Sequence, residues 1–144
     1  MNKDFDAWNK VKKAVHTKPD TFGVHERELW WASLGVNVGV ETDGKHQTFE
    51  RPVLVIRKFN RQMVCIVPTT SRGKDPRFYE QFSYQDRVYF TMLTQLRTIS
   101  TKRLLRKIGM MPKEDFEKVQ QRCSSFFEVD ENPRERGFSR RPKP

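Results

Sequence analysis

Hydroxyl and guanidinium groups stand at the outer ends of two consecutive apolar runs. Arg51 precedes the run PVLVI, and the run MVCIV leads through one proline into the polar residues Thr69, Thr70, Ser71 and Arg72. Both runs are rich in β-branched residues, and the chain turns after Asn60 between them, so we expect an antiparallel hairpin. That pairing would bring both polar clusters to one rim of the sheet. A guanidinium beside several hydroxyls is suited to a phosphate group.

A long loop, from Gly35 to Glu50, is expected directly before Arg51. It contains three glycines and alternating polar residues, and a structureless loop of this length in a compact domain is usually either functional or disordered. Because it ends on Arg51, it can lie over the polar rim. Its titratable residues, each of which could equally be a solvated surface charge, are Glu41, Asp43, Lys45 and His46.

Aromatic and basic side chains near this rim are candidates for contacts with bases. Trp30 and Trp31 point to opposite faces of their strand, so one should enter the core while the other is partly exposed. Four residues could stack on or pair with the bases of a single-stranded nucleic acid, or could instead pack in the core or rim: Trp31, Phe49, Phe78 and Arg97.

Metal and disulfide chemistry are not predicted. No second histidine or cysteine lies near His46 at metal-ligand spacing, so we expect no metal site and no cofactor. The two cysteines, Cys65 and Cys123, form no CxxC motif. They are expected to be buried thiols in a reducing compartment.

The overall charge favours a polyanionic partner. The 144 residues include 28 Lys and Arg against 18 Asp and Glu, a formal net charge of +10. Such a balance is typical of nucleic-acid binding, although many small soluble proteins are simply basic. No apolar run approaches the length of a membrane span, about 18 residues, and the N-terminus lacks the apolar core of a signal peptide. We therefore expect a cytoplasmic protein that does not bind membranes.

Short strands with peripheral helices organise the chain. We expect an amphipathic helix from Asp4 to about His16, a short helix capped by Ser100 and a final helix that begins at Pro112. The apolar stripe of the final helix is expected to consist of Phe116, Val119, Cys123 and Phe126. The expected strands lie at residues 28–34, 53–56, 63–67, 78–82, 88–93 and 107–110. This pattern predicts a mainly β fold with peripheral helices, a small barrel of the SH3-like type. The expected parts are an N-terminal helix and linker (1–20), the barrel with its final helix (21–128) and a disordered basic tail (129–144).

Several segments occur together in a recognisable order: ELWWASLG, GVETDGK, RPVLVI, VPTTS, TQLRTIS and KRLLRKIGMMPKEDFEKV. Taken together, over about Glu28 to Val119, they resemble the MazF/PemK family of toxins from toxin–antitoxin pairs. The resemblance implies an SH3-like barrel that forms a homodimer and has a cognate antitoxin as a partner. It also implies a metal-independent endoribonuclease that cuts single-stranded mRNA at short sequences.

The resemblance also implies roles for individual residues. By position, Arg51 is the family's catalytic arginine, Thr70 its catalytic threonine and Glu41 the acidic residue of its glycine loop. The substrate's own 2′-hydroxyl would attack, leaving a 2′,3′-cyclic phosphate, while Arg51 holds the nonbridging oxygens. Glu41 and His46 are the two candidates for the general base, Glu41 by family position and His46 by side-chain type. The expected RNA-binding residues are Lys45, His46, Phe49, Thr69, Ser71, Arg72, Gln95 and Arg97.

The sequence departs from the family pattern in three places. Between Gly44 and Arg51 the loop is longer than in the best-known members. Val40 and Thr94 stand where the PemK branch has a histidine and an aspartate. These departures leave the acid–base pair open, whereas the arginine and threonine are retained.

Two other functions stay open from the sequence. The first is a non-catalytic toxin on the same barrel, such as a poison of DNA gyrase, and the presence of Arg51 with Thr70 argues against it. The second is a nucleic-acid-binding or adaptor module that has lost activity, which the departures at Val40 and Thr94 favour.

Overall fold

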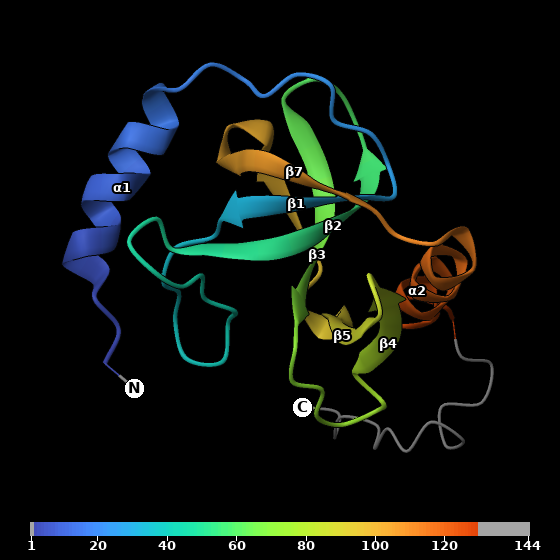
Figure 1. The fold of residues 1–144 in the computed structure, drawn as a ribbon. Coiled ribbons are helices and arrows are strands. Elements are labelled where there is room, and N and C mark those ends of the chain that lie inside the picture. Colours follow the sequence, from blue (N-terminus) through green and yellow to red (C-terminus); the bar gives the residue numbers. More distant parts are fainter. Residues whose placement is uncertain (1, 130–144) are drawn as a thin grey trace, which may run out of the picture.

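A seven-stranded sheet forms the body of the protein in a computed structural model that describes residues 2–129 (Figure 1). The elements in chain order are α1 (Phe5–Thr17), β1 (Glu28–Ser33), β2 (Glu50–Lys58), β3 (Met63–Thr70), β4 (Tyr79–Tyr84), β5 (Arg87–Met92), the 3-10 turn η1 (Leu93–Gln95), β6 (Arg97–Ser100), the 3-10 turn η2 (Thr101–Arg103), β7 (Leu104–Met110) and α2 (Lys113–Ser125). The mainly β class with peripheral helices is therefore confirmed. The predicted tail, apart from Val129, lies outside the described residues.

The sheet does not close into a barrel. Its order is β4-β5-β3-β2-β1-β7, with β6 paired to β3, so β4 and β7 are end strands with no ladder between them in the described chain. A side chain spans the gap, since the Tyr84 hydroxyl on β4 donates to the carbonyl of Ile108 on β7 at 3.2 Å. Gly109 permits this approach, because a Cβ there would lie 1.9 Å from the Tyr84 hydroxyl oxygen.

Both faces of the central hairpin β2–β3 are buried, which explains why its sequence is apolar without alternation. Val53 and Val55 belong to one hydrophobic cluster, and Leu54, between them, belongs to the other. The second cluster lies under α2, whose buried residues are Phe116, Val119 and Cys123. The predicted stripe of this helix also included Phe126, which is 41% exposed because it follows the last helical turn.

The N-terminal helix α1 begins where the sequence predicted. The side chain of Asp4 caps it by accepting a hydrogen bond from the amide of Ala7, and Trp8 is its only buried residue. The indole covers Gly35, where an added Cβ would lie 2.1 Å from the ring, and it meets Phe49 edge-on at 5.6 Å. The helix therefore docks on the two ends of the long loop between β1 and β2 (Figure 1).

Two details of the strand pattern have simple causes. Trp30 is buried while Trp31 is partly exposed, as the alternation of side chains along β1 requires. β7 begins at Leu104, earlier than predicted, because the turn capped by Ser100 ends at Arg103. Leu104 then pairs with Ala32 of β1 and joins the core.

Candidate active site

Arg51 lies at the start of β2 and is partly buried. Its Nε donates to the carbonyl of Asp43 at 2.7 Å, and its Nη1 donates to the carbonyl of Thr69 at 3.3 Å. Burial lowers the pKa of the guanidinium, and the nearby Asp43 carboxylate acts in the opposite direction. The group stays cationic at neutral pH, because guanidinium groups do not deprotonate in proteins.

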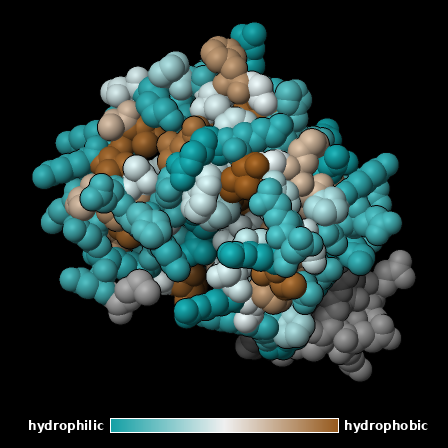
Figure 2. All heavy atoms as spheres, viewed as in Figure 1, coloured by the Kyte–Doolittle hydropathy of each residue, from teal (hydrophilic) through white to brown (hydrophobic). Residues whose placement is uncertain are grey.

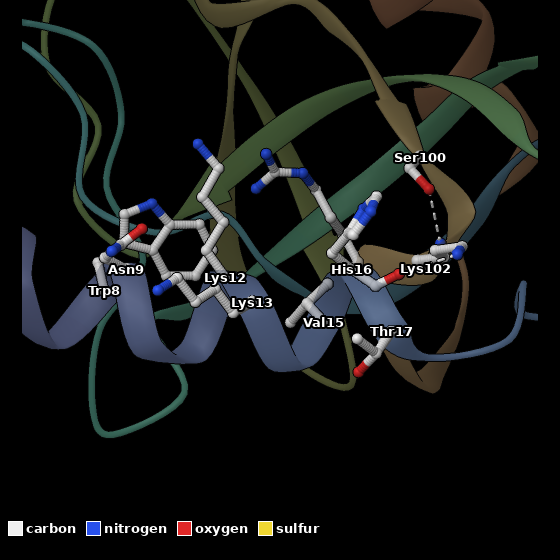
Figure 3. Close-up of a pocket in the computed structure, with 10 residues that line it drawn as sticks. Trp8, Asn9, Lys12, Lys13, Val15, His16, Thr17, Ser100 and Lys102 are labelled. Atoms are coloured by element: carbon white, nitrogen blue, oxygen red, sulfur yellow. Dashed lines mark hydrogen bonds between the residues drawn. The ribbon is translucent and has the colours of Figure 1, made fainter.

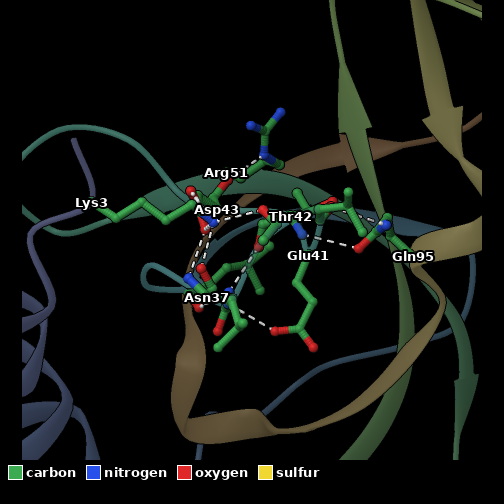
Figure 4. Close-up of polar contacts among 11 residues, drawn as sticks. Lys3, Asn37, Glu41, Thr42, Asp43, Arg51 and Gln95 are labelled. Atoms are coloured by element: carbon green, nitrogen blue, oxygen red, sulfur yellow. Dashed lines mark hydrogen bonds and ion pairs between the residues drawn. The ribbon is translucent and has the colours of Figure 1, made fainter. Parts of the chain in front are cut away.

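One amino group of this guanidinium faces outward. Nη2 of Arg51 makes no hydrogen bond to another part of residues 2–129, and the tip of the side chain points away from the loop residues in Figure 4. Two internal bonds thus fix the orientation of a charged donor that remains open to an anion. This is the arrangement that binds a phosphate oxygen with little loss of side-chain entropy.

The two threonines at the end of β3 differ in their surroundings. Thr69 is 4% exposed, and its hydroxyl donates to the carbonyl of Pro52 at 3.0 Å. Thr70 is partly exposed, and its Oγ1 accepts from the amide of Arg72 at 3.2 Å, which leaves its proton free to be donated. Thr69 therefore holds β3 against β2, whereas Thr70 can donate to a ligand.

Arg51 and Thr70 line one cleft of about 210 Å³. The other residues around this cleft are Trp31, Lys45, His46, Glu50, Pro52, Thr69, Ser71 and Tyr89. The structure thus brings together most of the predicted phosphate site and both basic residues of the long loop. Trp31 is among the residues predicted to contact bases, whereas no pattern in the sequence indicates Tyr89 or the role of Glu50.

Glu50 is already paired within the cleft. Arg106 on β7 donates to its two carboxylate oxygens at 2.8 and 2.9 Å, and these bonds lower the pKa of the Glu50 carboxyl. The same guanidinium lies over the ring of Trp31, 4.9 Å from its centroid. Arg106 therefore holds both the carboxylate and the indole at one wall of the cleft.

Glu41 does not line the cleft of Arg51 and Thr70. Its Oε1 accepts from the amide of Val38 at 2.9 Å and so closes a turn within the loop. It borders a second cleft of about 480 Å³, together with Gln95 and Arg97. Gln95 is also used structurally, since its Oε1 accepts from the amide of Thr42 at 3.0 Å. The predicted site residues thus divide between two clefts, and of the two candidate bases only His46 is in the first.

Two further predicted RNA-binding residues, Phe49 and Arg72, do not line the first cleft. Phe49 packs on Trp8 and has a left-handed backbone, with φ of 51°. His46 shares this conformation, with φ of 66°, which is strained for residues with a side chain. Arg72, two residues after Thr70, is exposed.

A polar network that the sequence did not predict holds the long loop (Figure 4). The Asp43 carboxylate accepts from the amide of Asn37 at 2.6 Å. It also pairs with the ammonium of Lys3, 3.3 Å away, and Lys3 donates further to the carbonyl oxygens of Asn37 and Gly39. The segment before α1 is thereby tied to the loop that contacts Arg51.

Two general properties bear on the class of protein. Within residues 2–129 there is no cluster of three or more His, Cys, Asp or Glu side chains arranged to hold a metal ion. In the same part of the chain, neither helix has the length and apolar character needed to span a membrane. Fold and site together define a small, basic, mainly β protein with a cleft suited to an anion.

Comparison with known proteins identifies the family. The model of the PemK-like, MazF-like toxins of type II toxin–antitoxin systems matches residues 25–127. The chain therefore belongs to this family, and the resemblance seen in the sequence is confirmed. The segment before residue 25, which includes Lys3 and α1, lies outside the match. No curated protein sequence matches the chain closely enough to count as a relative.

Solved structures share the fold at low sequence identity. MazF from Deinococcus radiodurans is 18% identical with a TM-score of 0.61, over 74% of this chain and 97% of that one. An endoribonuclease in complex with its cognate antitoxin, from a mycobacterial species, is 12% identical with a TM-score of 0.56, over 72% and 93%. The Mycobacterium tuberculosis toxin MazF-mt6 is 16% identical with a TM-score of 0.54, over 72% and 99%.

Proposed function

We propose that this toxin is an endoribonuclease that cleaves single-stranded RNA in the cleft of Arg51 and Thr70. The observation that carries the proposal is the outward-facing Nη2 of Arg51 beside the free hydroxyl proton of Thr70. Lys45 and His46 add basic groups to the same cleft. Of the similar structures, one is described as an endoribonuclease bound to its antitoxin.

The residues of the cleft have separate roles in phosphodiester cleavage. The 2′-oxygen of the substrate attacks the adjacent phosphorus, and its proton passes to a ring nitrogen of His46. Arg51 and Thr70 donate to the nonbridging oxygens, where negative charge develops. The bond from phosphorus to the 5′-oxygen then breaks, and solvent returns a proton to that oxygen. The products are a 2′,3′-cyclic phosphate and a 5′-hydroxyl, and no step requires a metal ion.

The same proposal includes the protein partners of a MazF-type toxin. A cognate antitoxin and a second copy of the chain are its expected partners, in a cytoplasmic setting. Solved relatives include a MazE–MazF complex from Deinococcus radiodurans. The face seen in Figure 2 is largely hydrophilic with scattered apolar side chains, and with the net charge of +10 this suits an acidic antitoxin segment.

Cleavage of a mixed-sequence single-stranded RNA in EDTA tests the activity. We expect cuts at one short sequence, with cyclic-phosphate ends identified by mass spectrometry. Arg51→Ala should lower the rate at least about 100-fold, and Thr70→Val about 10- to 100-fold. A 2′-deoxy sugar at the cut site should abolish cleavage, because the nucleophile is then missing.

Arg57→Ala serves as the matched control. Arg57 lies on the same strand as Arg51 but pairs with Glu26 on the surface, so its loss should leave the rate unchanged. Intact RNA after incubation with the wild-type protein would refute the nuclease. Equal losses in Arg51→Ala and Arg57→Ala would refute the assignment of the cleft.

A further inference from the structure

A groove of about 520 Å³ separates α1 from the turn η2 (Figure 3). Its walls are formed by residues of α1 between Trp8 and Thr17 and by Ser100, Lys102 and Arg103 around η2. Among residues 2–129 it shares no lining residue with the two clefts described above. Since α1 precedes the segment matched by the family model, one wall of this groove is an addition to the family's domain.

The groove is cationic, and no carboxylate of the described residues lines it. Lys12, Lys13, Lys102 and Arg103 line it, and none of them takes part in an ion pair within residues 2–129. Lys102 donates instead to the carbonyl of His16 at 3.0 Å, and Arg103 donates to the carbonyl of Ser33 at 3.0 Å. Neutral acceptors thus hold both cations in place without cancelling their charge.

Arg103 is the most constrained of these cations. Its guanidinium lies over the ring of Trp8, 5.7 Å from the centroid. Burial lowers its pKa, and repulsion from Arg97 lowers it further. Neither guanidinium is paired with a carboxylate within residues 2–129, so an anion bound near both would relieve the repulsion.

Arg103 and Arg97 together link the groove to the rest of the surface. Arg97 lines the second cleft with Gln95, so positive charge continues from α1 through Arg103 and Arg97 toward the long loop. The lining of the groove combines its cations with the apolar side chains of Trp8 and Val15. A nucleic-acid strand matches this pattern, because its phosphates recur along a backbone whose sugars present less polar surface.

We propose that the groove between α1 and η2 binds the phosphate backbone of RNA that extends beyond the cleavage cleft. This inference rests on the proposed function for its choice of RNA, but it concerns a separate surface. Lys12, Lys13 and Lys102 contact phosphates there, and Asn9 and Ser100 supply neutral hydrogen bonds. The site adds affinity for long substrates and reads no base sequence.

Fluorescence anisotropy tests this proposal without depending on cleavage. The full chain carrying Arg51→Ala is titrated with labelled mixed-sequence single-stranded RNA of 6 and of 20 nucleotides. Adding Lys12→Gln, Lys13→Gln and Lys102→Gln should weaken binding of the longer RNA about tenfold and reduce the slope of log affinity against log salt by about 2 to 3. The shorter RNA should bind nearly as before.

Lys113→Gln and Lys118→Gln on α2, combined with Arg57→Gln on β2, remove three exposed charges elsewhere and are the control for a general loss of charge. Equal weakening by the control, or no weakening by the groove variant, would overturn the proposal. A second titration uses poly-glutamate, and a loss confined to that probe would assign the groove to an acidic peptide instead. Cleavage by wild-type protein is scored separately, so failure of the nuclease and failure of the groove give different results.

Discussion

The backbone carbonyl of Asp43 accepts a hydrogen bond of 2.7 Å from Nε of Arg51. The side chain of the same aspartate pairs with Lys3 at 3.3 Å, so one residue of the long loop connects the N-terminal segment with the candidate active site. Lys3 lies outside the family domain, and yet it helps to place the loop that positions Arg51. The N-terminal segment is therefore part of the site's support.

Lys3→Met should lower activity while leaving the fold intact. The ion pair and the two carbonyl contacts of Lys3 would be lost, at a cost of about 1 kcal/mol, and the loop would hold Arg51 less firmly. We expect kcat for RNA cleavage to fall about three- to tenfold with little change in KM. Lys3→Arg should restore most of the rate, and a melting curve checks folding. Unchanged kcat in Lys3→Met would contradict this coupling.

The choice between the two candidate bases can be decided by a pair of substitutions. His46 lines the cleft of Arg51, whereas Glu41 closes a turn beside the second cleft. His46→Gln should therefore lower kcat about 100-fold, and Glu41→Gln should leave it within about threefold, the effect of a loosened turn. Single-turnover cleavage measures both. A larger loss in Glu41→Gln would restore the role that the family position implies.

Gly35→Ala should destabilise the docking of α1. The added methyl group would lie 2.1 Å from the Trp8 ring, and the φ of +81° is unfavourable for alanine. Gly39→Ala is the matched control, because φ is +56° there but nothing lies within 4 Å. Both variants incur a backbone cost of about 1 kcal/mol, and Gly35→Ala should lose about 1 to 3 kcal/mol more. Urea unfolding measures the difference, which should vanish if α1 does not dock.

The free energy of unfolding should fall in acid because the Glu28 carboxylate becomes protonated. This carboxylate is buried, and burial raises its pKa, but bonds from Lys107, with its ammonium 2.6 Å away, and from His25 and Trp30 outweigh that effect. The folded pKa is thus below 4.5, the ordinary value. The stabilisation is complete above pH 4.5 and is lost as the pH falls through the folded pKa.

Glu28→Gln isolates this contribution. At pH 7 the variant should be less stable by about 1 to 3 kcal/mol, because Lys107 and the buried donors lose their charged partner. Below pH 4.5 the difference from the wild type should shrink. Urea unfolding at several pH values gives both quantities, and a difference that stays constant down to pH 3 would rule out this linkage.

Local patterns in the sequence predicted the elements well. Pro52 and the following β-branched residues marked β2, and the spacing of Phe116, Val119 and Cys123 marked the buried face of α2. Local patterns did not predict that the sheet stays open, because closure into a barrel depends on strand register. Irregularities between β1 and β7 and between β2 and β3 change the twist without any clear mark in the sequence.

The candidate site was predictable only in part, for a related reason. Arg51 and Thr70 end neighbouring strands, so hairpin pairing alone brings them together. The path of the loop determines where Glu41 and His46 lie. That path depends on residues with a left-handed backbone, such as His46 and Phe49. The pair Lys3–Asp43 joins residues 40 positions apart, and no periodicity predicts such a contact.

One feature of β3 affects both halves of the phosphate site. Residues Met63–Ile66 of this strand pair with β6, whereas Thr69 and Thr70 pair with β5 in a separate ladder. Thr70 is therefore held in the ladder with β5, while Arg51 pairs with Ala32 of β1 at the start of β2. The position of the Thr70 hydroxyl relative to the Arg51 guanidinium thus depends on the β3–β5 ladder as well as on the β2–β3 hairpin.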